Sequence, residues 1–348
     1  MSRQIALDNI HLRAASRWGH TEYSLEYHKA YVRRLTGLEA SDAGAMQRMF
    51  EKWGVDLLWC TNDGLHDGWR ARGRATNMGH AAYAADGSDF VLAEQSPFRS
   101  AEEVWAFDPA AEYGLPDFGR QVDAYEQWYG EQCEQFPDQL VTGGYYKTLV
   151  SGAIEVFGWE MLLEAAADAR KMERVWDAFF RFTKFHMDAW ARTSVGVVIQ
   201  HDDFVWSAGA FMNPEVYRKV LIPRYAQMWK ELKAAGKKVL FCSDGTFTQF
   251  TEDLADAGAD GFIFEPTTDW KTMVERFGRT HCLIGSDVDC RDLSYGTWAT
   301  VKAKIDRTIE LANQCRGVIL AVGNHLPANI PEQMMERYRE CLMANWGR

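Results

Sequence analysis

The chain has 348 residues, of which 47% are hydrophobic and 25% are charged, as in ordinary soluble globular proteins. Its 38 basic and 49 acidic residues give a net charge of −11, which disfavours binding to nucleic acids and to anionic membranes. The N-terminus has no long apolar segment, and no stretch of about 18 apolar residues occurs, so we expect a cytoplasmic protein without a membrane span. The seven cysteines are scattered and form no CxxC pair, so a disulfide scaffold is not expected.

The first half of the chain predicts helices more clearly than strands. Residues 1–45 are expected to form an N-terminal extension. Glycine, aspartate and proline are scattered through residues 64–119, which we expect to be an insertion that caps a pocket. The expected elements of this half are helices over 43–53, 122–136 and 159–193, and strands over 56–60, 90–92 and 139–143.

The second half alternates short apolar runs with amphipathic helical stretches, which is typical of βα units in a parallel sheet. Seven or eight such strands favour one closed (β/α)8 barrel over residues 1–348 rather than an open sheet. No glycine-rich phosphate-binding motif follows any strand, so a nucleotide-binding sheet has little support. The expected strands are 195–200, 238–241, 261–264, 282–284 and 318–322, and the expected helices are 213–235, 247–257, 269–277 and 297–315.

Polar residues follow nearly every predicted strand, where a barrel of this type places its working residues. We expect their thiol, imidazole and carboxylate groups to converge on one face, as in a metal or acid–base site. Three consecutive residues in an extended segment cannot all face one ion, so at most two of residues 201–203 would do so. The strand-end residues are Asn62, His66, His201, Asp202, Asp203, Cys242, Asp244, Glu265, Asp289, Asn324 and His325.

Cys242 and Asp244 are two residues apart, so their side chains point to the same side of an extended segment. A thiolate, a carboxylate and the imidazole of His325 would suit zinc. The sequence leaves a structural alternative open, in which Cys242 is a small buried apolar residue and Asp244 caps the following helix through a turn at Gly245.

Four segments carry a resemblance to a known family. They are FEKWGVDLLWCTNDGL at 50–65, the stretch from HDDFVWSAGAF to GADGFIFEP at 201–266, LIGSDVDCRDLSYGT at 283–297 and GVILAVGNHLPANIPEQ at 317–333. The chain resembles the uroporphyrinogen decarboxylase superfamily, including its cobalamin-dependent methyltransferase branch. The resemblance implies a single (β/α)8 barrel with its site at the C-terminal mouth.

The two activities of that superfamily need different residues. The decarboxylases hold an acidic tetrapyrrole with an N-terminal arginine signature, which HLRAASRWGHTEYS at 11–24 does not resemble. The methyltransferases hold zinc with an HxC pair after the fifth strand and a cysteine after the last. The matching positions here are Cys242 and Asp244, followed by Asn324 or His325, and Glu265 is a candidate fourth ligand.

The resemblance and these residues together predict a metal-dependent methyltransferase or demethylase. It would move a methyl group between a small methylated substrate, for example an aromatic methyl ether, and a corrinoid protein or a thiol, with zinc as the metal. A dimer is compatible with the sequence. The expected catalytic residues are Asp203, Asp289 and Asn62, and the expected substrate contacts are His201, Asp202, Trp59, His66, Tyr145, Tyr146 and Trp206.

Two alternatives stay open from the sequence. One is a metal-free decarboxylase or lyase, in which Asp203 and Asp289 act as acid and base and Arg72 or Arg74 holds a substrate carboxylate. The other is a ligand-binding barrel without catalysis, because a fold does not fix a function.

Overall fold

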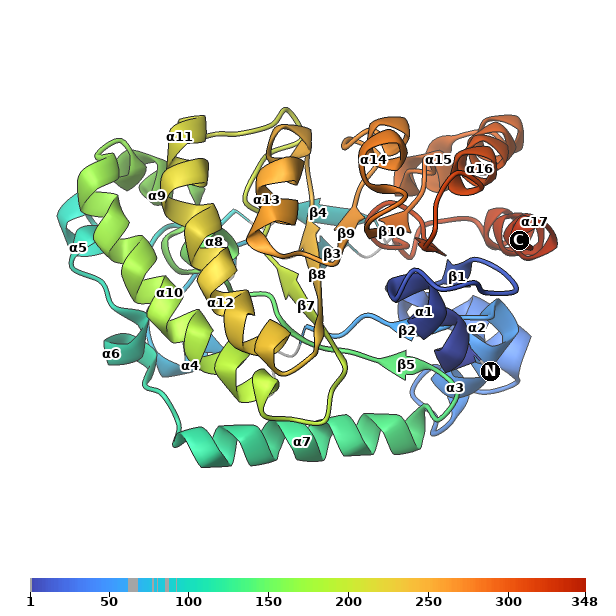
Figure 1. Cartoon of the computed structure of the whole chain (residues 1–348), viewed down its shortest axis with the longest axis horizontal. Coiled ribbons are helices and arrows are strands. Elements are labelled where there is room, and N and C mark those ends of the chain that lie inside the picture. The colour runs from blue at the N-terminus through green and yellow to red at the C-terminus, as the bar shows by residue number, and fades with distance from the viewer. Residues whose placement is uncertain (1, 62–67, 77, 80, 85–87, 92) are drawn as a thin grey trace.

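The computed structural model describes residues 2–61, 68–76, 78–79, 81–84, 88–91 and 93–348. Parallel strands form its centre, and helices surround them (Figure 1). One sheet has the order β1-β11-β10-β9-β8-β7-β6, and β2 pairs with β5. These strands are β1 (Gly19–His20), β2 (Leu57–Leu58), β5 (Leu140–Val141), β6 (Gly143–Tyr145), β7 (Val197–His201), β8 (Lys238–Ser243), β9 (Gly261–Phe264), β10 (Cys282–Gly285) and β11 (Val318–Leu320).

Backbone hydrogen bonds close these strands into a ring. The amide of Asp56, just before β2, donates to His20 O of β1 at 2.8 Å, and Leu140 N of β5 donates to Asp56 O at 2.7 Å. Strands β5 and β6 occupy one position in the ring, because only Thr142 separates them and its hydroxyl bonds to Leu58 O at 2.9 Å. The strands therefore fill eight positions, as the (β/α)8 prediction requires.

The barrel interior is a small apolar core of its own. Alternate residues of the strands point inward and pack together, as the period of two in a β-strand dictates. Ala6 and Ile10 of helix α1 (Ser2–Ile10) join this core and close the N-terminal end of the barrel. The inward residues are Leu57, Leu140, Val197, Ile199, Leu240, Cys242, Ile263, Cys282, Ile284 and Ile319.

The helices pack around the outside of the barrel over a larger apolar core, and α10, α12, α13 and α14 follow one another across the view in Figure 1. Besides α1 and three short helices between β2 and α7, the α-helices of the described residues are α2 (Lys29–Thr36), α3 (Ala45–Trp53), α7 (Phe118–Gln135), α8 (Val150–Phe157), α9 (Trp159–Ala166), α10 (Ala169–Ala191), α11 (Pro214–Val216), α12 (Ile222–Ala234), α13 (Thr251–Ala257), α14 (Trp270–Phe277), α15 (Cys290–Tyr295), α16 (Trp298–Ala312) and α17 (Glu332–Asn345).

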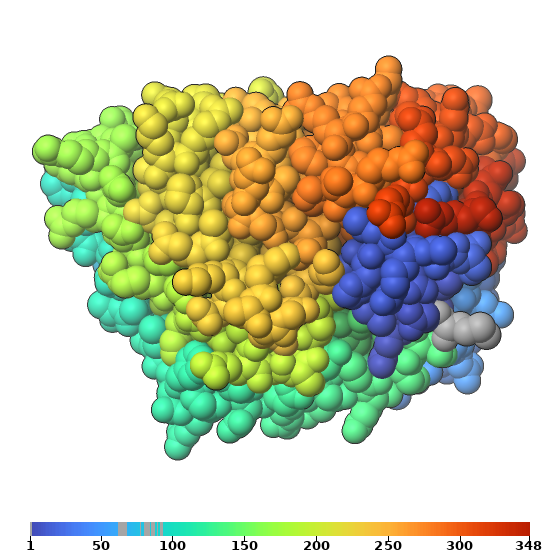
Figure 2. All heavy atoms as spheres, in the orientation of Figure 1, coloured from blue at the N-terminus to red at the C-terminus, as the bar shows by residue number. Residues whose placement is uncertain are grey.

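The two ends of the chain pack against each other, and Figure 2 shows the blue N-terminal residues beside the red C-terminal ones. Trp18 N donates to Trp346 O at 2.9 Å, and the Arg17 guanidinium lies 4.1 Å from the centre of a Trp346 ring. No helix in the described part of the chain combines the length and the apolar character that crossing a membrane requires.

The predicted (β/α)8 fold is confirmed, but two local expectations differ from the structure. Residues 1–45 are not only an extension, because β1 lies among them and pairs with β11, so the strand expected at 56–60 is the second of the barrel. The strand expected at 90–92 lies outside the barrel: β4 (Asp89–Val91) forms an antiparallel hairpin with β3 (Ala81–Tyr83). Between β2 and α7 the chain also forms α4 (Trp69–Arg72), α5 (Ala101–Trp105) and α6 (Pro109–Tyr113).

Candidate active site at the barrel mouth

A cavity of about 790 Å³ opens at the C-terminal ends of the strands. Its size is typical of a small-molecule site. Gly79 and Phe90, which belong to the segment between β2 and α7, also line it, so this segment covers part of the mouth. The polar lining includes His201, Asp203, Asp244, Glu265, Asn324 and His325, and the aromatic lining consists of Tyr23, Tyr27, Trp59, Phe90, Tyr146, Trp159 and Trp206.

His201 and Asp203 point into the cavity as a hydrogen-bonded pair. His201 ends β7, and its Nε2 lies 2.9 Å from Asp203 Oδ1. The Tyr146 hydroxyl donates to Asp203 Oδ2 at 2.6 Å, and Asp244 N donates to Asp203 Oδ1 at 2.9 Å. Burial on its own would raise the pKa of Asp203, but the charge of His201 and these hydrogen bonds outweigh burial and lower it. Asp203 is therefore ionised at neutral pH.

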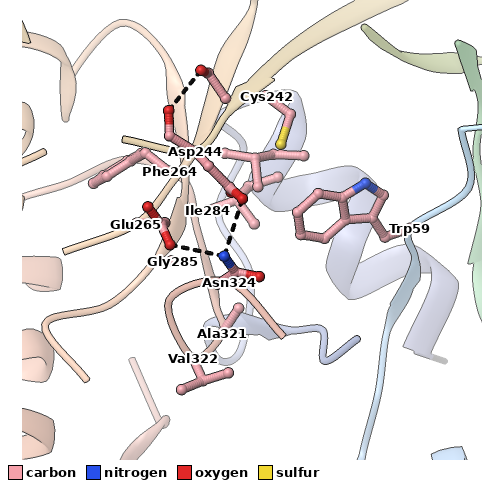
Figure 3. Close-up of a pocket in the computed structure, with 12 residues that line it drawn as sticks. Trp59, Cys242, Asp244, Phe264, Glu265, Ile284, Gly285, Ala321, Val322 and Asn324 are labelled. Atoms are coloured by element: carbon pink, nitrogen blue, oxygen red, sulfur yellow. Dashed lines mark hydrogen bonds between the residues drawn. The ribbon is translucent and has the colours of Figure 1, made fainter. Parts of the chain in front are cut away.

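Asp244 and Glu265 meet across the side-chain amide of Asn324. The amide nitrogen donates to Asp244 Oδ2 at 3.0 Å and to Glu265 Oε1 at 2.8 Å, as Figure 3 shows. Gly245 N donates to Glu265 Oε2 at 2.8 Å. Burial, followed by the charges of Asp203 and Glu265, raises the pKa of Asp244 well above its ordinary value. Without a cation, Asp244 therefore tends to keep its proton.

Three of these side chains are close enough together to share one metal ion. A ligand atom from each of His201, Asp203 and Asp244 lies within 4.8 Å of the others, and all three groups are partly buried. No other such group of histidine, cysteine and acidic residues occurs in the described part of the chain. The structure thus assembles a nitrogen and carboxylate ligand set from the ends of two neighbouring strands, β7 and β8.

Cys242 lies beside this group but is not part of it. It is 1% exposed and lines a narrow pit in the floor of the cavity together with Trp59, Asp244, Glu265 and Asn324 (Figure 3). Burial, and then the charges of Asp244, Asp203 and Glu265, raises the pKa of its thiol well above the ordinary value. The buried apolar role that the sequence left open for Cys242 fits this position.

His325 also lines the cavity without joining the group. Its Nδ1 lies 2.7 Å from Asn324 Oδ1, so it holds the amide that bridges the two carboxylates. Asn324 adopts a left-handed backbone conformation with φ of 72°. Asparagine tolerates this conformation better than most residues, and the turn directs its amide into the site.

Aromatic side chains form the walls above these groups. The Trp59 ring centre lies 5.8 Å from His201 and 5.6 Å from Tyr23. The Tyr146 ring lies 4.1 Å from His201. On another wall, the rings of Trp159 and Trp206 are 5.6 Å apart. The expected contacts Trp59, Tyr146 and Trp206 thus line the cavity.

Asp202, Tyr145 and Asp289 have other positions than the sequence suggested. Asp202 is fully buried behind the cavity, and its carboxylate accepts hydrogen bonds from the amides of Leu149, Val150 and Ser151 and from the Tyr225 hydroxyl. Tyr145 is 2% exposed and stacks on His186. Asp289 caps α15 and pairs with Arg291 at 2.6 Å. These three side chains stabilise the fold and do not line the cavity.

The other residues to which the sequence assigned a role either lie outside the described part of the chain or do not line the cavity. Asn62 and His66 lie outside the described residues. Arg72 lies near Tyr113, and Arg74 pairs with Glu112 at 3.0 Å, so neither arginine lines the cavity. Four aromatic residues that line the cavity were not among the predicted substrate contacts, namely Tyr23, Tyr27, Phe90 and Trp159. For Tyr23 a signal exists: it comes three residues after β1.

A family model described as uroporphyrinogen decarboxylase (URO-D) matches residues 154–344, more than half of the chain. The fold is similar to that of a methyltransferase from Methanosarcina mazei, with a TM-score of 0.66 and 16% identity over 99% of this chain and 98% of that chain. A D-psicose 3-epimerase from Clostridium cellulolyticum H10 gives a TM-score of 0.37 and 10% identity over 68% of this chain and 86% of that chain. No curated protein sequence matches the chain.

Proposed function

Because the chain belongs to the uroporphyrinogen decarboxylase family, we propose that it is a metal-assisted methyltransferase that acts at the mouth of its barrel. It would take a methyl group from a small methylated donor, such as an aromatic methyl ether, and pass it to a corrinoid protein or a thiol. The observation that carries the proposal is the group formed by His201, Asp203 and Asp244 in an aromatic-walled cavity. The similarity in fold to a methyltransferase supports this branch of the family.

The residues present fit a divalent cation. Imidazole nitrogen and carboxylate oxygen are ligands for zinc and for other first-row ions. In a tetrahedral zinc site with bonds of about 2.0–2.2 Å, two ligand atoms lie about 3.3–3.6 Å apart. The ligand atoms here lie within 4.8 Å of one another, so they would have to move together by up to about 1.5 Å. A cation would also offset the effects of burial and of the negative charges of Asp203 and Glu265, which raise the pKa of Asp244. We therefore assign His201, Asp203 and Asp244 as the ligands, with Glu265 beside them.

The metal, when bound, would act as a Lewis acid on the oxygen or sulfur of a reacting group. The protein's own residues position the reactants. Tyr146 and the Asp244 amide hold Asp203, which in turn holds His201. Trp59 and Trp206 would pack against the donor and exclude water from it. The acceptor nucleophile supplies the electron pair of the new bond to the methyl carbon. The bond between the methyl carbon and the donor heteroatom breaks, and its electron pair stays on the heteroatom.

The decarboxylase alternative has less support. It needs cationic side chains for substrate carboxylates, and neither Arg72 nor Arg74 lines the cavity. Its second acid–base residue, Asp289, caps a helix and pairs with Arg291. No specific observation favours a barrel that binds a ligand without catalysis.

Methyl transfer to free cob(I)alamin tests the proposal. The purified protein is incubated with guaiacol, choline and dimethyl sulfide in turn, and the loss of cobalt(I) absorbance is followed. We expect transfer from at least one donor and its loss in His201→Ala and Asp244→Asn, whereas Glu275→Gln, an exposed carboxylate on α14, keeps it. No transfer from any donor to cobalamin or to a thiol such as coenzyme M would contradict the proposal.

A further inference from the structure

The cavity is lined by acidic side chains but not by basic ones other than histidine, among the residues that the structure describes. Asp203, Asp244 and Glu265 line it, and no lysine or arginine does so among the residues that the structure describes. The positions outside the described part hold no lysine or arginine either, as the sequence shows. A donor with its own carboxylate would therefore meet acidic side chains and find no lysine or arginine to pair with, which is unfavourable in a partly buried site.

Two basic residues near the site lie outside the cavity, although the charge of Arg291 also acts on Glu265. Arg291 pairs with Asp289 at 2.6 Å and has a largely exposed side chain. Lys147 is buried and pairs with Glu155 at 2.9 Å, and its ammonium lies over the Trp69 ring. Neither side chain lines the cavity. Among the described groups that line the cavity, only a protonated histidine or the metal ion proposed above would repel a cationic ligand.

Aromatic rings surround the same space. Of the large apolar side chains that the described surface exposes, Tyr23, Tyr27, Phe90 and Trp206 line this cavity, and Tyr23 and Trp206 are 50% and 45% exposed. Single exposed apolar side chains are common, whereas exposed apolar side chains that gather in one place mark ligand or interaction sites. Aromatic faces next to carboxylates are the environment that binds methylated ammonium groups, through cation–π attraction and charge.

We propose that the methyl donor is a cation, a methylated ammonium compound held between the aromatic walls with Glu265 as its counter-charge. The inference rests on the proposed methyltransferase function and narrows its donor. In the transfer, the C–N bond breaks and its electron pair stays on nitrogen, so a quaternary ammonium leaves as a neutral tertiary amine. The new bond to the methyl carbon uses the electron pair of the acceptor nucleophile, cobalt(I) or thiolate.

Calorimetric binding of matched probes to the purified full chain tests this charge preference. Choline and 3,3-dimethyl-1-butanol have the same shape, but only choline is charged. We expect choline to bind at least about ten-fold more tightly than the neutral alcohol, and 4-methoxybenzoate, an anionic aromatic methyl ether, to bind more weakly than choline. Equal affinity of choline and the alcohol, tighter binding of 4-methoxybenzoate, or no binding of choline would overturn the inference.

Two variants locate the bound cation. Trp206→Leu and Glu265→Gln should each weaken choline binding about five- to ten-fold and change binding of the neutral alcohol less. The matched controls Tyr295→Leu, at an exposed aromatic outside the cavity, and Glu275→Gln should leave both affinities unchanged. Binding of choline unaffected by both site variants would also overturn the inference. If choline binds as expected but no donor supports methyl transfer, the proposed function fails and the charge preference stands.

Discussion

The side-chain amide of Asn324 donates a hydrogen bond to Asp244 Oδ2 at 3.0 Å. The same nitrogen donates to Glu265 Oε1, so one neutral group separates two carboxylates from different strand ends. An amide nitrogen carries two hydrogens and can satisfy both acceptors at once. The amide of Asn324 thus opposes the rise in the pKa of Asp244, although burial and the charges of Asp203 and Glu265 outweigh it.

Two replacements of Asn324 should distinguish the contribution of its side-chain amide to stability from the contribution of its backbone conformation. Asn324→Gly keeps the left-handed turn but removes the donor, and should lower the free energy of unfolding by about 1–3 kcal/mol. Asn324→Ala removes both, and should lose roughly 1 kcal/mol more. Urea unfolding measures both values. Equal stability of Asn324→Gly and the wild type would show that the amide does not stabilise the carboxylates.

Asp202 should matter for stability rather than for substrate binding. It accepts hydrogen bonds from three amides at the N-terminus of α8 and from Tyr225. Asp202→Ala leaves these donors unsatisfied, and we expect a loss of about 3 kcal/mol or more in unfolding free energy. The exposed control Asp256→Ala should change stability by less than about 0.5 kcal/mol. A stable Asp202→Ala protein with weakened donor binding would contradict this assignment.

The raised pKa of Asp244 predicts that the stability of the metal-free protein depends on pH. Below the ordinary Asp pKa of about 3.9, both the folded and the unfolded chain hold the proton. Above it, the unfolded chain ionises while folded Asp244 keeps its proton because its pKa is raised, so the wild type loses stability as pH rises through the folded pKa. Asp244→Asn has no carboxyl group to ionise. Its unfolding free energy should therefore rise relative to that of the wild type by up to about 1.4 kcal/mol per pH unit in that window.

Urea unfolding between pH 4.5 and 7.5 in the presence of a chelator measures this difference. Asp256→Asn, at an exposed position, should show a constant difference from the wild type. A constant difference for Asp244→Asn as well would mean that Asp244 ionises as readily in the folded chain as in the unfolded chain.

Tyr146 should strengthen metal binding at the proposed site without being a ligand itself. Tyr146→Phe keeps the ring beside His201 but removes the hydroxyl that donates to Asp203 Oδ2 at 2.6 Å. Loss of such an orienting hydrogen bond typically costs 10- to 100-fold in metal affinity or activity, that is about 1.4–2.7 kcal/mol. Competition with a chelating dye measures the affinity, with Tyr295→Phe as the control. Unchanged metal affinity of Tyr146→Phe would show that the Tyr146 hydroxyl does not support metal binding.

The sequence predicted the barrel because its later strands are continuous apolar runs between amphipathic helices, as in β8, where all residues from Val239 to Ser243 are buried. It missed β1, because two residues of a strand give no periodic pattern. Gly19 of β1 also packs closely on a neighbouring strand, since a side chain there would meet Ile319 at 2.9 Å. Such a close contact depends on the tertiary fold and leaves no local signal.

The gathering of polar residues at one end of the barrel could be predicted from the sequence, because strand order alone brings the strand ends together. Alternation along the chain explains why His201 and Asp203 face the cavity while Asp202 faces α8. The choice of Asp203 rather than Cys242 as the neighbour of Asp244 depends on the register of β7 and β8, which pairs His201 with Cys242 and places Asp203 beside Asp244. A spacing of two residues in one strand could not reveal a partner in the next strand.

Metal stoichiometry of the purified protein tests the central claim most directly. Elemental mass spectrometry is applied to protein grown with added zinc and purified without a metal-affinity tag. We predict about one metal ion per chain, lost in His201→Ala, Asp203→Asn and Asp244→Asn and kept in Cys242→Ser. A wild-type protein without metal, or loss of the metal in Cys242→Ser while Asp203→Asn retains it, would contradict the assigned ligand set.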